Sequence, residues 1–299
     1  MDCAKGRRPR SIRDDCGATE VGNKPLKNVE EWASSPVLFL SQISRQLERI
    51  SLQFDPPIAH LSLKHPPVNV IDILGMEELA SALAQVESRP EISSLLIRGA
   101  GNCFAAGVNV ADHTPDKVGE MLQKFHSVVR SIVTTKKVTI AAVHGNCLGG
   151  GAELAMVCDI VITTDDAAWG FPEIKLGCFP PIAATALAAL IGQKRASQLI
   201  LTGRSITGSE AASMGLATVA VSAATLNSAV EEMIEHLRAL SPAALATAKK
   251  AIYTWDAMHF DKGLARAEKI YLDELMHTED AQEGIRAFLE KRSPLWKNR

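Results

Sequence analysis

The chain has 299 residues, of which 46% are hydrophobic and 22% charged, and its formal net charge is −2. Because acidic and basic residues nearly balance, no overall field would draw the protein to nucleic acid or to a membrane surface. No apolar run approaches the roughly 20 residues that a membrane-spanning helix needs. The length fits one large domain with appendages, and we expect neither a nucleic-acid nor a membrane partner.

Six cysteines are spread along the chain at positions 3, 16, 103, 147, 158 and 178, and none forms a C-x-x-C pair. That spacing is typical neither of a zinc site nor of a disulfide framework. We therefore expect free thiols in a reducing compartment, a cytoplasmic protein and no bound metal.

Residues 1–35 differ from the rest of the chain, because they are polar, mixed in charge and without a hydrophobic period. They lack the apolar stretch of a secretory signal, and their acidic residues argue against a transit peptide. We expect a disordered N-terminal extension, with an arginine-rich arm that binds nucleic acid as the alternative. Residues 37–50 fit either a short helix or a first strand.

From residue 51 onward, short apolar strands alternate with helical patterns. Two strands are predicted around a turn at residues 55–57, and others at 94–98, 139–143, 160–164, 167–171 and 219–221. Helices are predicted at 79–86, 117–132, 152–158, 183–191, 196–202 and 209–214. This alternation favours an α/β domain with parallel strand pairing. After residue 224 only helices are predicted, at 226–240, 242–255, 260–275 and 278–290.

Two loops rich in small residues follow the carboxyl ends of predicted strands, which is the edge where open α/β sheets bind ligands. The first spans residues 99–112, and the second contains Gly149, Gly150 and Gly151. The triplet lacks the residues of a P-loop and of a dinucleotide fingerprint. A strand, a glycine turn and a helix expose backbone N–H groups, which can hold a developing oxyanion.

Two carboxylates accompany the second loop. Glu153 lies in the first turn of the helix after the glycines, and Glu173 follows twenty residues later in the segment GFPEI. A pair of carboxylates can move protons or activate water. By spacing alone, Glu153 could instead stabilise the helix start by about 0.3–1 kcal/mol, and Glu173 could be a surface carboxylate. We interpret His144 and Asp159 as structural residues.

Five segments resemble signatures of the crotonase (enoyl-CoA hydratase/isomerase) superfamily. They are NCFAAGVNV at 102–110, HGNCLGGGAELAMVCDI at 144–160, GFPEIKLG at 170–177, LILTGRSITGSEAASMGLA at 199–217 and FLEKRSPLWK at 288–297. The resemblance covers about residues 51–299. It implies a crotonase-like α/β fold, with a ββα spiral core over residues 36–224 and a helical trimerisation region over residues 225–299.

The resemblance also implies a mechanism and a set of site residues. The N–H groups of Ala106 and Gly150 would hold a thioester oxygen, and Glu153 and Glu173 would flank a water molecule or the reacting carbons. Members with both glutamates tend to be hydratases, so the resemblance favours addition of water to an α,β-unsaturated acyl-CoA. An acyl-CoA isomerase or hydrolase is the alternative.

Further roles are expected from the resemblance and from the residues beside its motifs. It implies no cofactor beyond the coenzyme A of the substrate, no metal, and a homotrimer or homohexamer. The residues that would contact the substrate are Ala105, Gly107, Val108, Asn109, Gly149, Phe179, Pro180 and Pro181, with Lys291 at coenzyme A.

The chain departs from the family pattern at two places. Asn109 stands where an aspartate is usual, and residues 178–186 read CFPPIAATA where many members are rich in glycine. Pro180 and Pro181 stiffen this loop, and Phe179 adds an apolar wall. Together with GFPEIKLG, the CFPP segment resembles cyclohexa-1,5-diene-1-carbonyl-CoA hydratases of anaerobic aromatic (benzoyl-CoA) degradation. We therefore expect a cyclic dienoyl-CoA as substrate, with a generic enoyl-CoA hydratase as the alternative.

Overall fold

The computed structural model describes residues 47–297 and residue 299, without the side chains of residues 254–258. The predicted N-terminal extension, its boundary at residue 35 and most of the segment 37–50 lie outside the described residues. Of that segment, Ile50 begins the first strand of the sheet.

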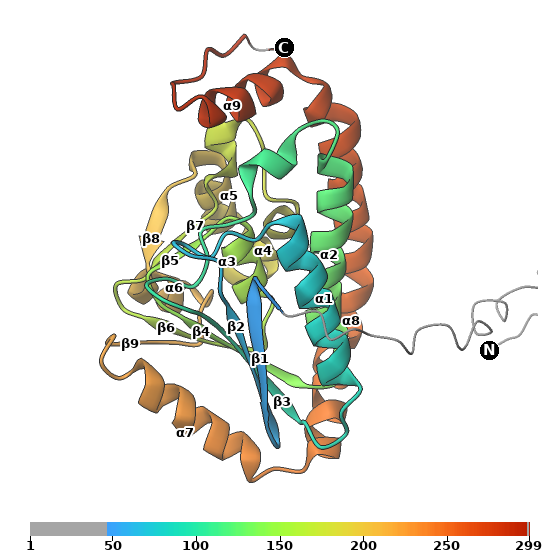
Figure 1. The fold of residues 1–299 in the computed structure, drawn as a ribbon, viewed down its shortest axis with the longest axis vertical. Helices are drawn as coiled ribbons and strands as arrows, with labels where there is room; N and C mark the ends of the chain where they lie inside the picture. Colours follow the sequence, from blue (N-terminus) through green and yellow to red (C-terminus); the bar gives the residue numbers. More distant parts are fainter. Residues whose placement is uncertain (1–46, 298) are drawn as a thin grey trace, which may run out of the picture. The chain divides into compact units, whose positions relative to one another are not determined.

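The described residues contain a six-stranded sheet (Figure 1). Its strands, in spatial order, are β1 (Ile50–Asp55), β2 (Ile58–Leu63), β3 (Ser94–Gly99), β4 (Val138–Val143), β6 (Ile160–Thr164) and β9 (Val219–Val221). β1 pairs antiparallel with β2, and every later pair is parallel. The predicted α/β class and the predicted parallel pairing are therefore confirmed.

Both faces of this sheet are covered, because successive side chains of a strand point to opposite sides. Leu96, Ile140 and Ile162 face α7 (Leu226–Arg238), whose buried side chains form a separate apolar cluster with them. Leu95 and its neighbours on the other face belong to the main core. Covering on both faces explains why these strands read as continuous apolar runs in the sequence.

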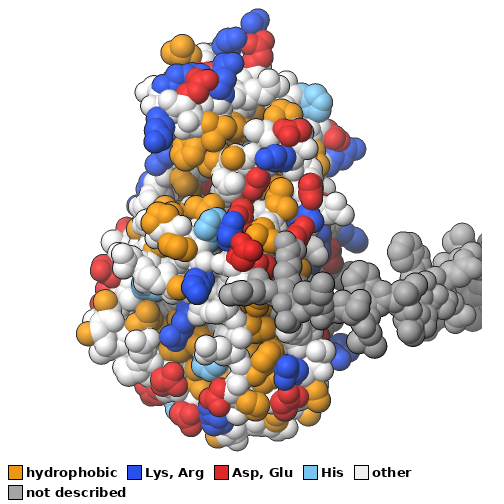
Figure 2. All heavy atoms as spheres, viewed as in Figure 1, with side chains coloured by type: hydrophobic (Ala, Val, Ile, Leu, Met, Phe, Trp, Pro, Cys, Tyr) orange, Lys and Arg blue, Asp and Glu red, His pale blue; other side chains and the backbone are white. Residues whose placement is uncertain are grey.

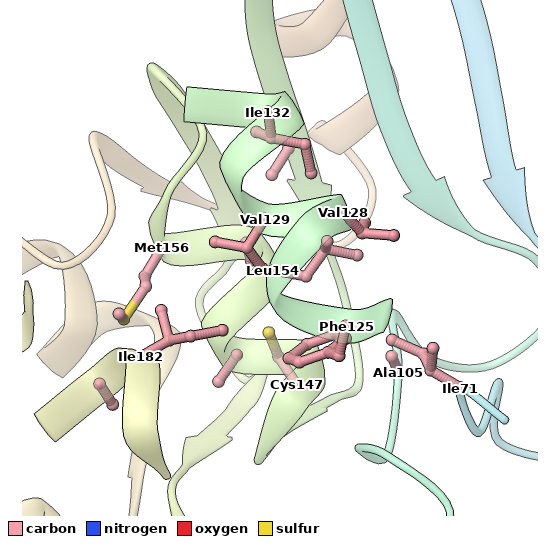
Figure 3. Packing of buried hydrophobic residues seen from close by; sticks show 14 of the residues in the cluster. Ile71, Ala105, Phe125, Val128, Val129, Ile132, Cys147, Leu154, Met156 and Ile182 are labelled. Atoms are coloured by element: carbon pink, nitrogen blue, oxygen red, sulfur yellow. The ribbon is translucent and has the colours of Figure 1, made fainter. Parts of the chain in front are cut away.

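The main core is built around α2 (Val118–Thr134), which packs against α1 (Ile73–Glu87). Figure 3 shows Phe125 and Val129 of α2 beside Leu154 of α3 (Gly150–Met156). The helix predicted at 117–132 is confirmed, and its buried side chains lie on one face. α2 thereby fixes the helix that begins within the glycine triplet.

A second, three-stranded sheet supports the glycine triplet. It consists of β5 (Asn146–Leu148), β7 (Ala168–Gly170) and β8 (Ser205–Thr207). β7 was predicted, but β5 and β8 were not, because their sequences NCL and SIT contain polar residues and form no apolar run. The chain leaves β5 at the glycine triplet and leaves β7 just before Glu173. This sheet therefore sets the two carboxylate-bearing segments side by side.

Three helices follow Glu173 and complete the core: α4 (Pro181–Ile191), α5 (Gln193–Thr202) and α6 (Gly208–Met214). α6 begins with a capping box, in which Thr207 accepts from the N–H of Glu210 and Glu210 accepts from that of Thr207. The predicted helices are confirmed, and each begins slightly earlier than expected.

The C-terminal region is helical as predicted, but two predicted helices are one. α8 (Pro242–Lys269) runs unbroken through residues 256–259, which contain neither proline nor glycine to stop it. It continues into a π-helical turn, Ile270–Glu274, and a 3-10 turn, Leu275–His277, before α9 (Glu279–Leu289). α8 packs along α2 and α4, so the C-terminal region returns to the core (Figure 1).

The surface agrees with the balanced charge of the sequence. On the face drawn in Figure 2, basic and acidic side chains are interspersed, with hydrophobic ones between them. Among the described helices, none is both long and apolar enough to cross a membrane.

Candidate active site

A cavity of about 460 Å³ lies where the two glycine loops, α2 and the C-terminal helices meet. Ten of the predicted site residues line it: Ala106, Gly107, Val108, Gly149, Gly150, Glu153, Glu173, Phe179, Pro180 and Pro181. A larger cavity, about 840 Å³, lies between α4, α6 and α8, and neither glutamate lines it. The smaller cavity is therefore the candidate active site.

Three predicted contact residues do not line this cavity. Ala105 is fully buried, and its N–H and carbonyl groups pair with β5. Asn109 caps the 3-10 turn Val110–His113 with its side chain. Lys291 is exposed on the surface, and its neighbour Arg292 lines the cavity instead. The structure therefore places these three residues outside the lining of the cavity, and their contacts with substrate or coenzyme A stay predictions.

The first loop offers a different N–H group from the one predicted. The N–H of Ala106 donates to the carbonyl oxygen of Val68 at 2.9 Å, so it is not free for a ligand. Ile71 pairs with the residues on either side of Val108, because it donates to Gly107 and accepts from Asn109. In such a bridge the central N–H points away from the partner strand. The N–H of Val108 donates to no described residue.

The two loops touch at this point. A methyl group added to Gly150 would come within 2.6 Å of the Val108 side chain, and one added to Gly107 would lie 3.8 Å from the Gly150 nitrogen. Gly150 begins α3, where the first N–H groups have no partner within the helix. Its N–H, like that of Val108, donates to no described residue. Two free N–H groups thus come from two loops in contact.

Gly149 carries the close approach between the second loop and Glu173. Its φ is +51° and its N–H donates to Gly170 of β7 at 2.9 Å. A Cβ here would stand 2.6 Å from Oε1 of Glu173. Only glycine accepts both this backbone conformation and this neighbour.

Glu153 is held by the first turn of α4. Its side chain is buried, and Oε1 accepts hydrogen bonds from the N–H groups of Ile182 at 3.0 Å and Ala183 at 2.9 Å. Pro180 and Pro181 have no N–H, so the free donors of this helix begin at Ile182. Burial raises the pKa of Glu153, and the two hydrogen bonds offset part of that rise.

Glu173 lies in the 3-10 turn Pro172–Leu176, against Gly149. Its Oε2 is buried and has no hydrogen-bond partner among the described residues. Burial is the larger cause of the raised pKa of Glu173, and the negative charge of Glu153 raises this pKa further. Two carboxyl groups in one buried site cannot easily ionise together, so one can serve as acid and the other as base.

The other polar residues singled out in the sequence have structural partners. His144 contacts the carbonyl oxygen of Gly101 through Nε2 at 2.9 Å. Asp159 accepts from the N–H of Thr139 at 2.7 Å and from the Lys249 ammonium at 2.7 Å. Neither residue lines the candidate site, as the structural interpretation requires.

Sequence reasoning missed the residues that α2 and the C-terminal region bring to the cavity. His126 is fully buried and contacts Glu268 of α8 through Nδ1 at 2.5 Å. Tyr271 comes from the π-helical turn, and Arg292 from beyond α9. No spacing in the sequence relates these residues to the glutamates. His126 and Tyr271 meet through the packing of α8 against α2 and α4, and Arg292 follows α9, which packs against the turn that holds Glu173.

This arrangement of fold and site is that of crotonase-fold enzymes. The family model described as enoyl-CoA hydratase/isomerase matches residues 53–299. A cyclohexa-1,5-dienecarbonyl-CoA hydratase of Thauera aromatica is 34% identical over 260 residues, covering 87% of this chain and all of that protein. A probable enoyl-CoA hydratase of Bacillus subtilis (strain 168) is 35% identical over 263 residues, covering 84% and 99%.

The structural comparison agrees. The crystal structure of an enoyl-CoA hydratase from Mycobacterium avium subsp. paratuberculosis K-10 superposes with a TM-score of 0.77 at 25% identity, covering 84% of this chain and 100% of that one. The chain belongs to the enoyl-CoA hydratase/isomerase family, and its enzyme class is acyl-CoA hydratase.

Proposed function

We propose that the cavity between the two glycine loops adds water across the double bond of an α,β-unsaturated acyl-CoA. The observation that carries this proposal is the meeting of two buried carboxylates with two free N–H groups in one cavity. The N–H groups of Val108 and Gly150 would donate hydrogen bonds to the thioester oxygen and stabilise the enolate-like charge that develops on it.

Proton transfers complete the reaction. One glutamate takes a proton from water while the water oxygen bonds to the β-carbon. The electron pair of the double bond moves toward the thioester, and the other glutamate donates a proton to the α-carbon. The raised pKa values of Glu153 and Glu173 suit this division, because one carboxyl can stay protonated while its neighbour is ionised. These steps need no metal and no cofactor beyond the coenzyme A of the substrate.

For the acyl group, we propose a cyclic dienoyl thioester, cyclohexa-1,5-diene-1-carbonyl-CoA. The wall of the cavity beyond the glutamates is formed by Phe179, Pro180 and Pro181, with Tyr271 edge-on to the Phe179 ring. A rigid, aromatic wall suits a planar ring better than a mobile chain. The similarity to the hydratase of Thauera aromatica supports the same choice.

A substrate panel tests this choice. We expect kcat/KM for cyclohexa-1,5-diene-1-carbonyl-CoA to exceed that for crotonyl-CoA by about ten- to a hundredfold, since pocket shape discriminates acyl groups on that scale. Product mass reports the reaction type, because hydration adds one water. Equal or better use of crotonyl-CoA would make the protein a generic enoyl-CoA hydratase. A product of unchanged mass would mark an isomerase, and free coenzyme A a hydrolase.

We also propose a homotrimer or homohexamer in the cytoplasm. Several large apolar side chains of the C-terminal region are exposed in the single chain, among them Ile252, Phe288 and Leu295. Burial of such side chains between subunits would remove them from water. Light scattering on the purified protein distinguishes a monomer, a trimer and a hexamer.

A further inference from the structure

Tyr271 is a buried tyrosine in the wall of the candidate site, and no pattern in the sequence indicated it. Only 1% of its surface is exposed, and it lines the same cavity as Glu153 and Glu173. Its ring meets Phe179 edge-on, with centroids 5.2 Å apart and planes at 63°. It belongs to the π-helical turn Ile270–Glu274, an irregularity that is frequent at functional sites.

The hydroxyl group of Tyr271 has the Cys178 thiol beside it, which is a weak hydrogen-bond partner, and no nitrogen or oxygen partner among the described residues. A buried hydroxyl without a strong partner costs about 1–3 kcal/mol, so its retention in the cavity wall suggests a better acceptor or donor from a ligand. Burial raises the pKa of Tyr271, and the Cys178 thiol and the charges of Glu173 and Glu153 add to that rise. The phenol therefore stays protonated at neutral pH and can donate a hydrogen bond.

Glu173 has a hydrogen-bond acceptor that lacks a donor. Its Oε2 is buried without a partner, and a carboxylate oxygen accepts hydrogen bonds. One cavity therefore contains a donor without a strong partner, the Tyr271 hydroxyl, and an unpaired acceptor, Glu173 Oε2. A water molecule or an alcohol between the two groups would satisfy both, because its oxygen accepts one hydrogen bond while its O–H donates another.

We infer that Tyr271 is a further catalytic residue, whose hydroxyl donates a hydrogen bond to the oxygen atom that is added to the substrate while Glu173 accepts one from it. This inference rests on the proposed hydration. Before reaction the oxygen belongs to water, and afterwards it is the hydroxyl of the hydrated acyl-CoA. Tyr271 orients this oxygen and neither gains nor loses a proton over the reaction.

This role predicts which ligands depend on the Tyr271 hydroxyl for their binding affinity. A hydroxyacyl-CoA carries the oxygen that Tyr271 binds, whereas a saturated acyl-CoA of the same carbon skeleton does not. Loss of the phenol hydroxyl should therefore weaken binding of the hydroxyacyl-CoA and leave binding of the saturated acyl-CoA unchanged. A residue that merely shaped the wall would affect both ligands alike.

The test compares Tyr271→Phe with the wild-type enzyme. We expect kcat for hydration to fall by about ten- to a hundredfold, and Kd for the hydroxyacyl-CoA to rise by a similar factor, while Kd for the saturated acyl-CoA stays the same. The melting temperature should be unchanged or higher, because the substitution removes a buried hydroxyl without a strong partner. Tyr253→Phe is the matched control, since Tyr253 lines the larger cavity and should change neither value.

Three outcomes would overturn the inference. The first is that Tyr271→Phe keeps both kcat and the affinity for the hydroxyacyl-CoA within about twofold. The second is that the affinities for the two ligands fall equally. The third is a clear fall in melting temperature, which would show that the hydroxyl is bonded within the protein. A wild-type enzyme that hydrates no unsaturated acyl-CoA would count against the proposed function instead. The comparison of the two ligands would still decide the role of Tyr271.

Discussion

Substitution of Glu173 by glutamine is expected to lower kcat for hydration by about 10²–10⁴-fold, the usual contribution of a positioned acid or base. Glutamine keeps the size of the side chain beside Gly149 but cannot exchange a proton. Loss of the absorbance of the conjugated thioester measures the rate. Glu120→Gln is the control, because Glu120 lies on the exposed side of α2 and should keep full activity.

The same variant should also change how stability depends on pH. The folded-state pKa of Glu173 is raised above the ordinary glutamate value of about 4.3, so its carboxyl form favours folding. Stability therefore falls as pH rises from that value through the raised pKa, because the folded state then loses a proton that it binds more tightly than the unfolded chain. Glutamine does not titrate. The melting temperature of Glu173→Gln minus that of the wild type should grow with pH, and a constant or shrinking difference would contradict the burial of this carboxyl.

The second large effect is expected from Gly149→Ala. The new Cβ would stand 2.6 Å from Oε1 of Glu173, at a φ of +51° that alanine rarely adopts. Displacement of a reacting group by about 1 Å can cost 10²-fold in rate, and we expect a loss of at least that order in kcat. The strained backbone should add about 1–3 kcal/mol of destabilisation, measured by denaturant unfolding.

Gly119→Ala provides the control for this substitution. Gly119 lies in the first turn of α2, and a Cβ there meets nothing within 4 Å. Alanine is a better helix former than glycine, so this variant should keep its activity and gain up to about 1 kcal/mol of stability. Full activity in Gly149→Ala would mean that the Glu173 carboxylate does not depend on the second glycine loop for its position.

The regular elements could be predicted from the sequence because burial leaves a clear pattern. β4 is buried along its whole length and reads as an apolar run, and α2 shows one apolar face. The three-residue strands β5 and β8 leave no such pattern, although β5 leads directly into the glycine triplet. The separation of two helices at residues 256–259 was wrong because the apolar period lapses there without any residue that ends a helix.

The part of the site that lies within one continuous segment of the sequence could be predicted. Glu153, Glu173 and the glycine triplet stand in one stretch, and the structure brings them to one cavity. Which N–H of the first loop is free could not be predicted, because it depends on pairing with Val68 and Ile71, more than thirty residues earlier. Tyr271 could not be found either, because it lies about a hundred residues beyond Glu173.

The central claim is that the cavity holding Glu153 and Glu173 adds water to an unsaturated acyl-CoA. Incubation of the wild-type enzyme with cyclohexa-1,5-diene-1-carbonyl-CoA and crotonyl-CoA in ¹⁸O-labelled water, followed by mass spectrometry of the products, tests it most directly. We predict that at least one thioester gains one water carrying the label, and that Glu173→Gln makes the product far more slowly. Unchanged thioesters, or products without the label in the acyl group, would contradict the claim.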